Sequence, residues 1–188
     1  MDGIIFDVDG TLWDSVEVVA ESWNLAIKEN SDLEPNLNRE ILQGLFGKTM
    51  DEIAAGVFPD LDTDSRRKLM DICFDYENRY LETHPGVYYE GVMDTLKELA
   101  LEYPLFIVSN CQCGYIEVMM KGAGMEPYIK DFLCFGQTQT SKDLTILKLM
   151  EKNNLTSPVY VGDTQGDADS CKKSRYPFYL CCIWSWRC

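Results

Sequence analysis

Two aspartates follow directly after an apolar stretch near the start of the chain. The letters "GIIF" at 3–6 run into Asp7, and Asp9 comes two residues later. A carboxylate costs several kcal/mol to bury unless a positive group meets it. We therefore expect Asp7 and Asp9 to lie at the end of a buried strand and to face a cation.

Two later apolar stretches also end in polar residues. The stretch 104–110 ends in Ser109 and Asn110, and the letters "SPVYVG" are followed by Asp163 and, four residues on, Asp167. In an open parallel sheet, ligands bind at the carboxyl ends of the strands. We therefore expect these polar groups to gather at one edge of a sheet and form a single site.

Such a site would be crowded with negative charge. Asp7, Asp9 and Asp163 would lie within a few ångströms, and Asp167 would belong to the same acidic cluster, so a cation must hold them together. The chain has one histidine, His84, so the ligands would be oxygens. Oxygen ligands point to a hard ion such as Mg²⁺, which usually also binds water and a substrate phosphate.

The elements that must position these residues follow from the spacing of apolar residues. From residue 14 to about residue 81 the spacing is helical, with no convincing strand, and "HPG" at 84–86 breaks the pattern. After it, strands and helices alternate, which predicts an α/β fold with a parallel sheet and right-handed crossovers. The expected strands are 3–8, 104–110, 131–135 and one beginning near 157, and the expected later helices are 92–99, 114–122 and 141–153.

Composition limits the partners and the compartment. The 188 residues carry a formal net charge of −14, which argues against nucleic acid or an anionic membrane as the main partner. We see neither a signal peptide nor an apolar run long enough for a membrane span, so we expect a cytoplasmic protein. The eight cysteines lack the paired spacing of a zinc site, and we interpret them as reduced, mostly buried thiols.

Four short motifs occur in a characteristic order. They are "DVDGT" at 7–11, "VSN" at 108–110, "SK" at 141–142 and "GDTQGD" at 162–167. Together they resemble the motifs of the haloacid dehalogenase superfamily, and the chain is similar to its phosphoglycolate phosphatase-like and beta-phosphoglucomutase-like branch. The resemblance implies a Rossmann-like, three-layer parallel-sheet core formed by 1–13 and 85–188. It also implies an inserted all-helical cap at 14–84.

The resemblance also implies the roles of the two N-terminal acids and of the metal ligands. Asp7 would be the nucleophile that forms an aspartyl-phosphate, and Asp9 would be the general acid and base. The carbonyl of Asp9 would also touch the metal. Asp163 would bind Mg²⁺, with Asp167 in the same cluster.

The remaining motif residues would bind the phosphate. Gly10 and Thr11 would let the loop turn over it, and Ser109 and Asn110 would donate hydrogen bonds to its oxygens. Lys142 would balance the charge on the nucleophile and the phosphoryl group. Its assignment is open because "KDLTI" lacks the Lys-Pro often seen in the family. Lys148 also lies close by, whereas Asp169 is expected to be a solvated helix residue.

The predicted cap should select the substrate. The letters "GLFGKTM" at 44–50 lie between two short helices, where Lys48 could reach a substrate anion; the alternative is an exposed lysine in a plain turn. Trp13 and Trp23 could line the cleft between cap and core, although core packing is favoured for Trp23.

The predicted function is that of a Mg²⁺-dependent phosphatase acting on a small phosphorylated metabolite. One alternative is a beta-phosphoglucomutase-type transfer, in which the phosphoryl group returns to a sugar. Another is a non-catalytic relative that binds phosphate or a partner protein. The sequence specifies neither the substrate nor the oligomeric state.

The end of the chain has an unusual composition. The fourteen residues "RYPFYLCCIWSWRC" contain three of the eight cysteines and two of the four tryptophans. We interpret the tail from about residue 175 as frameshifted or otherwise altered, with the last helical layer missing or replaced. Zinc binding by Cys181, Cys182 and Cys188 is a minor alternative.

Overall fold

The computed structural model describes residues 1–174 and 177–180. The chain divides into two compact units, one formed by Met1–Asp14 with Val87–Cys188 and the other by Ser15–Gly86. The boundaries expected from the sequence are 13/14 and 84/85. Each unit has a hydrophobic core of its own.

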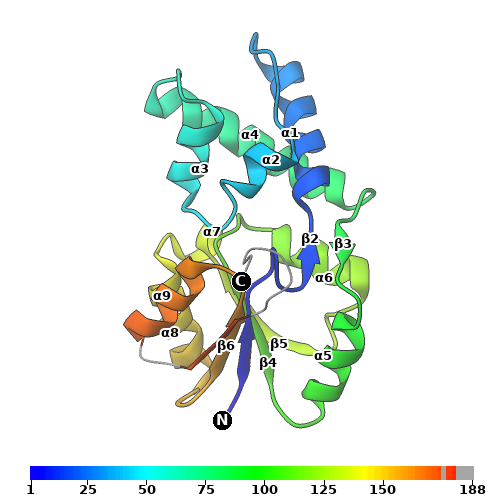
Figure 1. Ribbon diagram of the computed structural model, residues 1–188, viewed down its shortest axis with the longest axis vertical. Helices are drawn as coiled ribbons and strands as arrows, with labels where there is room; N and C mark the ends of the chain where they lie inside the picture. Colours follow the sequence, from blue (N-terminus) through cyan, green and yellow to red (C-terminus); the bar gives the residue numbers. More distant parts are fainter. Residues whose placement is uncertain (175–176, 181–188) are drawn as a thin grey trace. The chain divides into compact units, whose positions relative to one another are not determined.

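The first unit is built on a five-stranded sheet in the order β5-β4-β1-β6-β7 (Figure 1). All of its neighbouring strands are parallel. A separate antiparallel pair joins β2 to β3. The strands are β1 Ile4–Phe6, β2 Trp13–Asp14, β3 Val87–Tyr88, β4 Leu105–Ser109, β5 Ile129–Cys134, β6 Val159–Gly162 and β7 Phe178–Leu180.

The central strands are buried because helices cover both faces of the sheet. Every residue of β1 and β4 is buried, as the continuous apolar runs in the sequence predict. The register pairs Phe6 with Ile107 on one side and with Val161 on the other. The carboxyl ends of β1, β4 and β6 therefore lie at the same edge.

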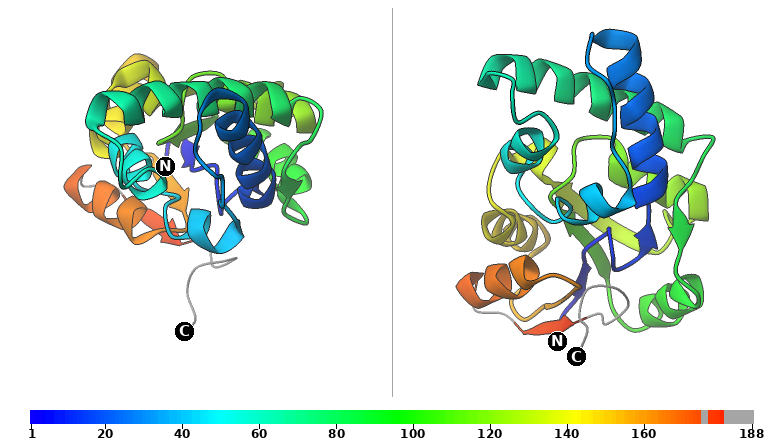
Figure 2. Two further views of the ribbon diagram at one scale, coloured as in Figure 1. Left: turned by 90° about the horizontal axis from the view of Figure 1, so that it is seen from above. Right: turned by 45° about the horizontal axis from the view of Figure 1, so that its top comes forward.

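The helices of this unit form the outer two layers. Figures 1 and 2 show α5 and α6 on one side of the sheet and α8 and α9 on the other. Side chains of α8 pack with those of the strands in one core cluster. The fold class is therefore the predicted one, an α/β Rossmann-like fold around a parallel sheet. The helices are α5 Val92–Ala100, α6 Tyr115–Ala123, α7 Phe135–Thr138, α8 Lys142–Asn153 and α9 Gln165–Ser174.

In the second unit, whose residues are all described, the regular elements are four helices joined by loops. Trp23 and Cys73 lie in its core, where the Trp23 indole N–H donates to Glu77 at 2.5 Å. Trp23 is thus a core residue, as favoured from the sequence. Its helices are α1 Val16–Asn30, α2 Arg39–Gln43, α3 Met50–Val57 and α4 Thr63–Leu81.

The elements that differ from expectation are short. The first helix begins after Ser15 and not at Asp14, because Trp13 and Asp14 form β2 and pair with Tyr88 and Val87. A two-residue strand has no periodicity by which the sequence could predict it. The four-residue helix α7 was likewise not expected.

Part of the unusual tail is described. The backbone of β7, Phe178–Leu180, pairs in parallel with β6, so a fifth strand is present in the segment that we expected to be altered. Residues 175–176 and 181–188 lie outside the described residues. The frameshift hypothesis and the zinc alternative at Cys181, Cys182 and Cys188 rest largely on them.

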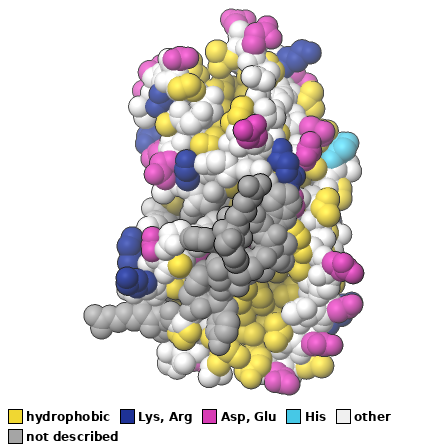
Figure 3. Space-filling model, viewed as in Figure 1, with side chains coloured by type: hydrophobic (Ala, Val, Ile, Leu, Met, Phe, Trp, Pro, Cys, Tyr) yellow, Lys and Arg dark blue, Asp and Glu magenta, His cyan; other side chains and the backbone are white. Residues whose placement is uncertain are grey.

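The surface and the helix lengths agree with the composition. Acidic side chains are spread over the described part of the face in Figure 3, with lysines and arginines among them. Within the described residues, no helix is both long enough and apolar enough to cross a membrane.

Candidate active site

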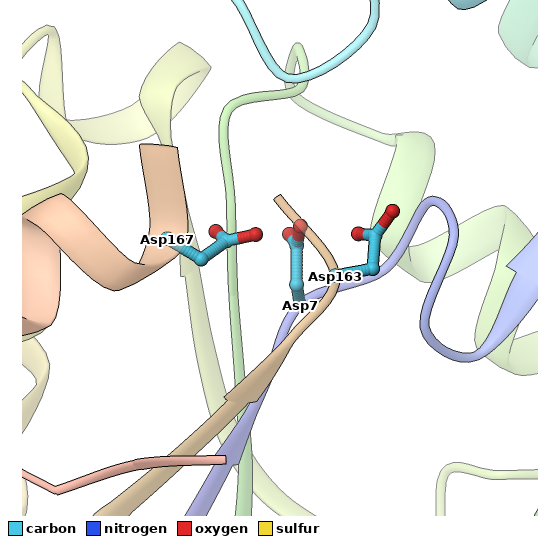
Figure 4. Close-up of side chains that lie close together, drawn as sticks. All are labelled: Asp7, Asp163 and Asp167. Carbon is cyan, nitrogen blue, oxygen red and sulfur yellow. The ribbon is translucent and has the colours of Figure 1, made fainter. Parts of the chain in front are cut away.

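Three buried aspartates meet at the carboxyl edge of the sheet (Figure 4). Asp7 follows β1, Asp163 follows β6, and Asp167 lies in the first turn of α9. One carboxylate oxygen from each lies within 4.8 Å of the others. The register of β1 and β6 explains this meeting, since Asp7 N–H donates to the Val161 carbonyl at 2.8 Å.

A buried lysine faces this cluster. Lys142, the first residue of α8, places Nζ 3.1 Å from Asp7 Oδ1 and 2.6 Å from Asp167 Oδ1. Lys148 is exposed, and its Nζ donates instead to the Thr138 carbonyl at 3.3 Å. Of the two lysines that the sequence left open, Lys142 is therefore the one that contacts the acids.

Asp167 is held on both of its oxygens. Oδ1 accepts from Lys142, and Oδ2 accepts from the Thr164 backbone N–H at 3.0 Å and from the Thr164 hydroxyl at 2.6 Å. Asp167 N–H donates in return to the Thr164 hydroxyl, which is the reciprocal pattern of a capping box. Asp167 is thus held in place by Thr164 and in turn positions the Lys142 ammonium. Asp169, two residues on, is exposed and accepts a bond from Gln165.

Burial and crowding change the acidities in this cluster. Burial, together with the Asp167 charge, raises the pKa of Asp7 well above its ordinary value and raises the pKa of Asp163 to about 6. Burial alone would also raise the pKa of Asp167, but Lys142 and Thr164 hold it below its ordinary value. Burial would lower the pKa of Lys142, yet Asp167 and Asp7 keep it raised. Lys142 is thus charged, and among the described residues its charge is too small to offset the burial and mutual repulsion of Asp7 and Asp163.

The donor set fits a hard divalent cation. Three carboxylates and one ammonium leave an excess of negative charge in a buried place. Because Lys142 and Thr164 engage Asp167, the oxygens best suited to a cation are those of Asp7 and Asp163. Oxygen donors of this kind suit Mg²⁺ better than a soft transition metal.

The loop after Asp7 is folded tightly against this cluster. Gly10 adopts φ +77°, and a Cβ at this position would collide with the Asp163 carboxylate. The backbone N–H of Leu12 donates to the Val8 carbonyl at 2.8 Å. Thr11 is buried, and its hydroxyl has no hydrogen-bond partner within the described residues. The backbone of the loop at Gly10 therefore lies directly against the Asp163 carboxylate.

Asp9 has a partner that the sequence did not reveal. The hydroxyl of Tyr115 donates to Asp9 Oδ1 at 2.5 Å, and the Tyr115 ring packs edge-on against Trp13. Tyr115 opens α6 directly after Gly114, which adopts a left-handed conformation. The only signal in the sequence is that this helix follows the strand of the second motif. The pairing of residues 9 and 115 depends on the tertiary fold.

The remaining predicted residues have different locations. Ser109 is buried at the end of β4, and Asn110 follows it, half-buried. Both lie at the edge of the sheet where the acids meet. Lys48 belongs to the helical unit, where its exposed side chain lies in the loop between α2 and α3. Trp13 is 1% exposed and packs between Tyr88 and Tyr115.

Comparison with known proteins identifies the class. A family model described as haloacid dehalogenase-like hydrolase matches residues 4–180, so the chain belongs to the haloacid dehalogenase-like hydrolase family. This confirms the resemblance seen in the motifs. No curated protein sequence matches the chain.

Solved structures share the fold. A predicted phosphoglycolate phosphatase from Haemophilus somnus 129pt is 22% identical, covers 95% of this chain and 84% of its own, and has a TM-score of 0.81. A haloacid dehalogenase-like family hydrolase from Streptococcus pneumoniae is 19% identical over 96% of this chain and 84% of its own, with a TM-score of 0.77. A predicted phosphatase from Clostridium acetobutylicum is 19% identical over 94% and 82%, with a TM-score of 0.74.

Proposed function

We propose that this hydrolase is a Mg²⁺-dependent phosphatase that acts on a small phosphorylated metabolite through an aspartyl-phosphate on Asp7. The observation that carries the proposal is the position of Asp7. Its carboxylate is buried at the edge of the sheet, 3.1 Å from a buried lysine and beside Asp163. A carboxylate in that place can approach a phosphate dianion only where positive charge cancels the repulsion.

In the first step, an oxygen of Asp7 attacks phosphorus while the bond from phosphorus to the leaving oxygen breaks. Asp9 donates a proton to that leaving oxygen, so the alcohol departs neutral. The hydroxyl of Tyr115 donates to Asp9 Oδ1 and thereby orients the carboxyl group for this transfer. The product of this step is a phosphoryl group bound covalently to Asp7.

In the second step, water attacks the phosphorus of the aspartyl-phosphate. Asp9, now ionised, takes a proton from the water, the bond between Asp7 and phosphorus breaks, and phosphate leaves. Lys142 stays charged throughout, because Asp167 and Asp7 raise its pKa. It therefore offsets negative charge on Asp7 and on the transferring group without itself exchanging a proton.

Mg²⁺ would be held by Asp7, Asp163 and the backbone carbonyl of Asp9, with Asp167 supporting the cluster through Lys142. When bound, the ion supplies positive charge to the phosphate oxygens and orients them for attack. Thr11, Ser109 and Asn110 would bind the other phosphate oxygens.

The proposed substrate is a small metabolite and not a polymer. The net charge of −14 would repel nucleic acid outside a local cationic pocket. Phosphoglycolate is a sensible first candidate because one structural neighbour is described as a predicted phosphoglycolate phosphatase. Lys48 is a candidate for contacting the rest of the substrate.

The test is a phosphate-release screen with Mg²⁺ over phosphoglycolate, sugar phosphates, glycolytic intermediates and nucleotides. It should include Asp7→Asn and the matched surface variant Asp169→Asn. We expect release by the wild type and by Asp169→Asn, loss in Asp7→Asn, and loss in the wild type when EDTA removes the metal.

Other outcomes identify the alternatives. Label that moves from one sugar phosphate to a second sugar, and not to water, would identify a mutase. Protein that binds Mg²⁺ but releases phosphate from no substrate would identify a non-catalytic relative. Equal activity in the wild type and in Asp7→Asn would remove Asp7 from the nucleophile role.

A further inference from the structure

Three cysteines come together beside the candidate active site. Cys111 and Cys113 lie in the loop that leaves β4 after Ser109, and Cys134 ends the neighbouring strand β5. The register pairs Ser109 with Cys134 directly, so the loop starts next to the third sulfur. Cys111 and Cys113 each lie close enough to Cys134 for that residue to contribute to raising the pKa of their thiols.

Backbone contacts hold the loop against the end of β5. Gly136 N–H donates to the Cys111 carbonyl at 3.0 Å, and the Cys134 thiol donates to the Gln112 carbonyl at 3.6 Å. A Cβ on Gly136 would collide with the backbone of Cys113 and lie 3.0 Å from its sulfur. A glycine at 136 therefore allows the loop to approach this closely, and it keeps Cys113 close to Cys134.

The three thiols differ in access. Cys113 is exposed, whereas Cys111 and Cys134 are buried. A small reagent in solution would therefore meet Cys113 first, with Cys134 behind it. Solvent access and a neighbouring thiol that can resolve the first one are two features of redox-sensitive pairs.

The acidities of the three thiols favour Cys134 as the thiol that resolves a mixed disulfide on Cys113. The hydrogen bond from Cys111 is the main reason that the pKa of Cys134 is lowered, to about 7. Burial is the largest cause that raises the pKa of Cys111 and also that of Cys113. Of the two buried thiols, Cys134 is thus the one that readily forms a thiolate near neutral pH, and the thiolate is the attacking species in exchange.

We propose that Cys113 and Cys134 form a thiol–disulfide exchange site that reacts with low-molecular-weight disulfides. In the first step, the Cys113 thiolate attacks one sulfur of the reagent RSSR, forming a Cys113–S–SR bond and releasing RS⁻. In the second step, the Cys134 thiolate attacks the Cys113 sulfur, forming the Cys113–Cys134 disulfide and releasing a second RS⁻. The two protein thiols lose two protons and are oxidised, while the reagent is reduced to two thiols.

The link would act on the catalytic edge of the sheet. Ser109 pairs in register with Cys134, so the proposed phosphate-binding serine lies next to the residue that carries the reactive sulfur. Bonding Cys134 to Cys113 removes the thiol that contacts Gln112 and shifts the loop that begins at Ser109. We expect slower phosphate release in the linked protein, a consequence that rests on the proposed function.

The test treats the full chain with oxidised glutathione and maps disulfides by mass spectrometry after blocking the remaining thiols. Trypsin would place Cys111 and Cys113 in peptide 98–121 and Cys134 in peptide 131–142. We expect these two peptides to be recovered joined and two hydrogen atoms lighter than their sum.

Variants identify the sulfurs. The joined peptide should form in the wild type and in Cys111→Ser, and should be absent in Cys113→Ser and Cys134→Ser. Cys73→Ala, in the core of the helical unit, is the matched control and should link like the wild type. Linkage through Cys111, or to a cysteine beyond residue 180, would overturn the proposal, as would a mixed disulfide on Cys113 that never resolves.

An activity assay tests whether disulfide formation changes phosphate release. Phosphate release by the wild type should fall on oxidation and return with dithiothreitol, while Cys113→Ser should be unaffected by the oxidant. Because the peptide map does not depend on turnover, it tests the exchange site even if no substrate is found. A complete link that leaves phosphate release unchanged would overturn the effect on the catalytic edge.

Discussion

Lys142 carries the positive charge that the acidic cluster requires. Its ammonium lies between Asp7 and Asp167, and its side chain is 5% exposed. Replacing it with methionine keeps much of the side-chain volume but leaves two buried carboxylates facing each other. Removing one partner from a buried ion pair costs about 3–5 kcal/mol.

Lys142→Met should therefore lower both stability and activity. We expect the free energy of unfolding, measured by urea titration, to fall by about 3–5 kcal/mol. Phosphate release should fall by about a hundredfold or more, the usual cost of removing a charge-stabilising group from a transition state. Lys148→Met is the matched control because Lys148 is an exposed lysine of the same helix. Wild-type stability in Lys142→Met would contradict the proposed ion pairs.

Tyr115 positions the proposed general acid and base. Tyr115→Phe removes the hydroxyl that donates to Asp9 and keeps the ring that packs against Trp13. Hydrogen bonds to charged groups contribute about 1.5–3 kcal/mol, so we expect kcat to fall by about tenfold or more. The acid limb of the pH–rate profile should move to higher pH, because a carboxylate that loses a donor is protonated more easily.

A purely structural role for Tyr115 would give a different result. The variant would then lose thermal stability without any displacement of the pH–rate profile. Tyr88→Phe provides the comparison, since the Tyr88 hydroxyl donates to the Met119 carbonyl and the Tyr88 ring also packs on Trp13.

At the residue scale, the polar side chains that follow the ends of the strands could be predicted from the sequence. Asp7 and Asp163 could be predicted to meet because each follows an apolar run, and parallel strands end at one edge. Tyr115 could not be predicted, because nothing in the sequence relates a residue at the start of one helix to a loop 106 positions earlier. The contact between Thr164 and Asp167 joins residues three positions apart, so local sequence could indicate it. The contact of Asp167 with Lys142 joins residues 25 positions apart and depends on the tertiary fold.

At the scale of elements, the loop between β1 and β2 sets the approach to the acids. Gly10 meets two constraints at once, a left-handed φ of +77° and close contact with Asp163. Gly91 has nearly the same φ, +79°, but a Cβ there would have no atom within 4 Å. Substituting each glycine in turn therefore distinguishes the cost of the left-handed backbone from the cost of crowding Asp163.

Gly10→Ala and Gly91→Ala should have similar backbone strain but different phosphate-release activity. Each should lose about 1–2 kcal/mol of stability, measured by urea unfolding, from the left-handed backbone alone. Gly10→Ala should lose more than this and should also lose phosphate release and stabilisation by Mg²⁺, because the new methyl displaces the Asp163 carboxylate. Gly91→Ala should keep both. Equal activity in the two variants would show that the loop tolerates movement.

The long elements could be predicted from apolar spacing, and the short ones could not. Helices such as α6 and α8 were expected within one residue of their observed bounds, because several turns repeat the same pattern. β2 and β7 have two and three residues, too few to show a period. In β7 the unusual composition of the surrounding tail concealed a strand that pairs with β6.

At the scale of the whole molecule, the chemistry and the proposed choice of substrate belong to different units. All members of the acidic cluster and Lys142 come from the sheet unit, whose core fixes their positions. Lys48 comes from the helical unit. Under the proposed function, the motifs would set the reaction class, and residues that no motif constrains would select the substrate.

The pH dependence of the protein's folding stability should differ with and without bound metal. The pKa of Asp163 is raised from 3.8 to about 6 in the folded state, and that of Asp7 is raised well above 3.8. Without metal, the stability contributed by their neutral forms is fully present below about pH 4 and is lost as the pH rises through about 6 for Asp163. A cation needs the ionised forms, so its binding has the opposite dependence.

We therefore expect the rise in Tm caused by Mg²⁺, relative to EDTA, to be small near pH 5 and to grow as the pH passes about 6. Differential scanning fluorimetry at constant ionic strength measures it. Asp163→Asn should flatten the pH dependence of the metal-free protein and abolish the response to Mg²⁺, while Asp169→Asn should behave like the wild type. A metal-induced shift that is equal at all pH values, or that survives in Asp163→Asn, would place the cation away from the three aspartates. In that case Lys142 would be the cation that faces the three aspartates. One positive charge does not balance three carboxylates, so a phosphate dianion could not bind beside them.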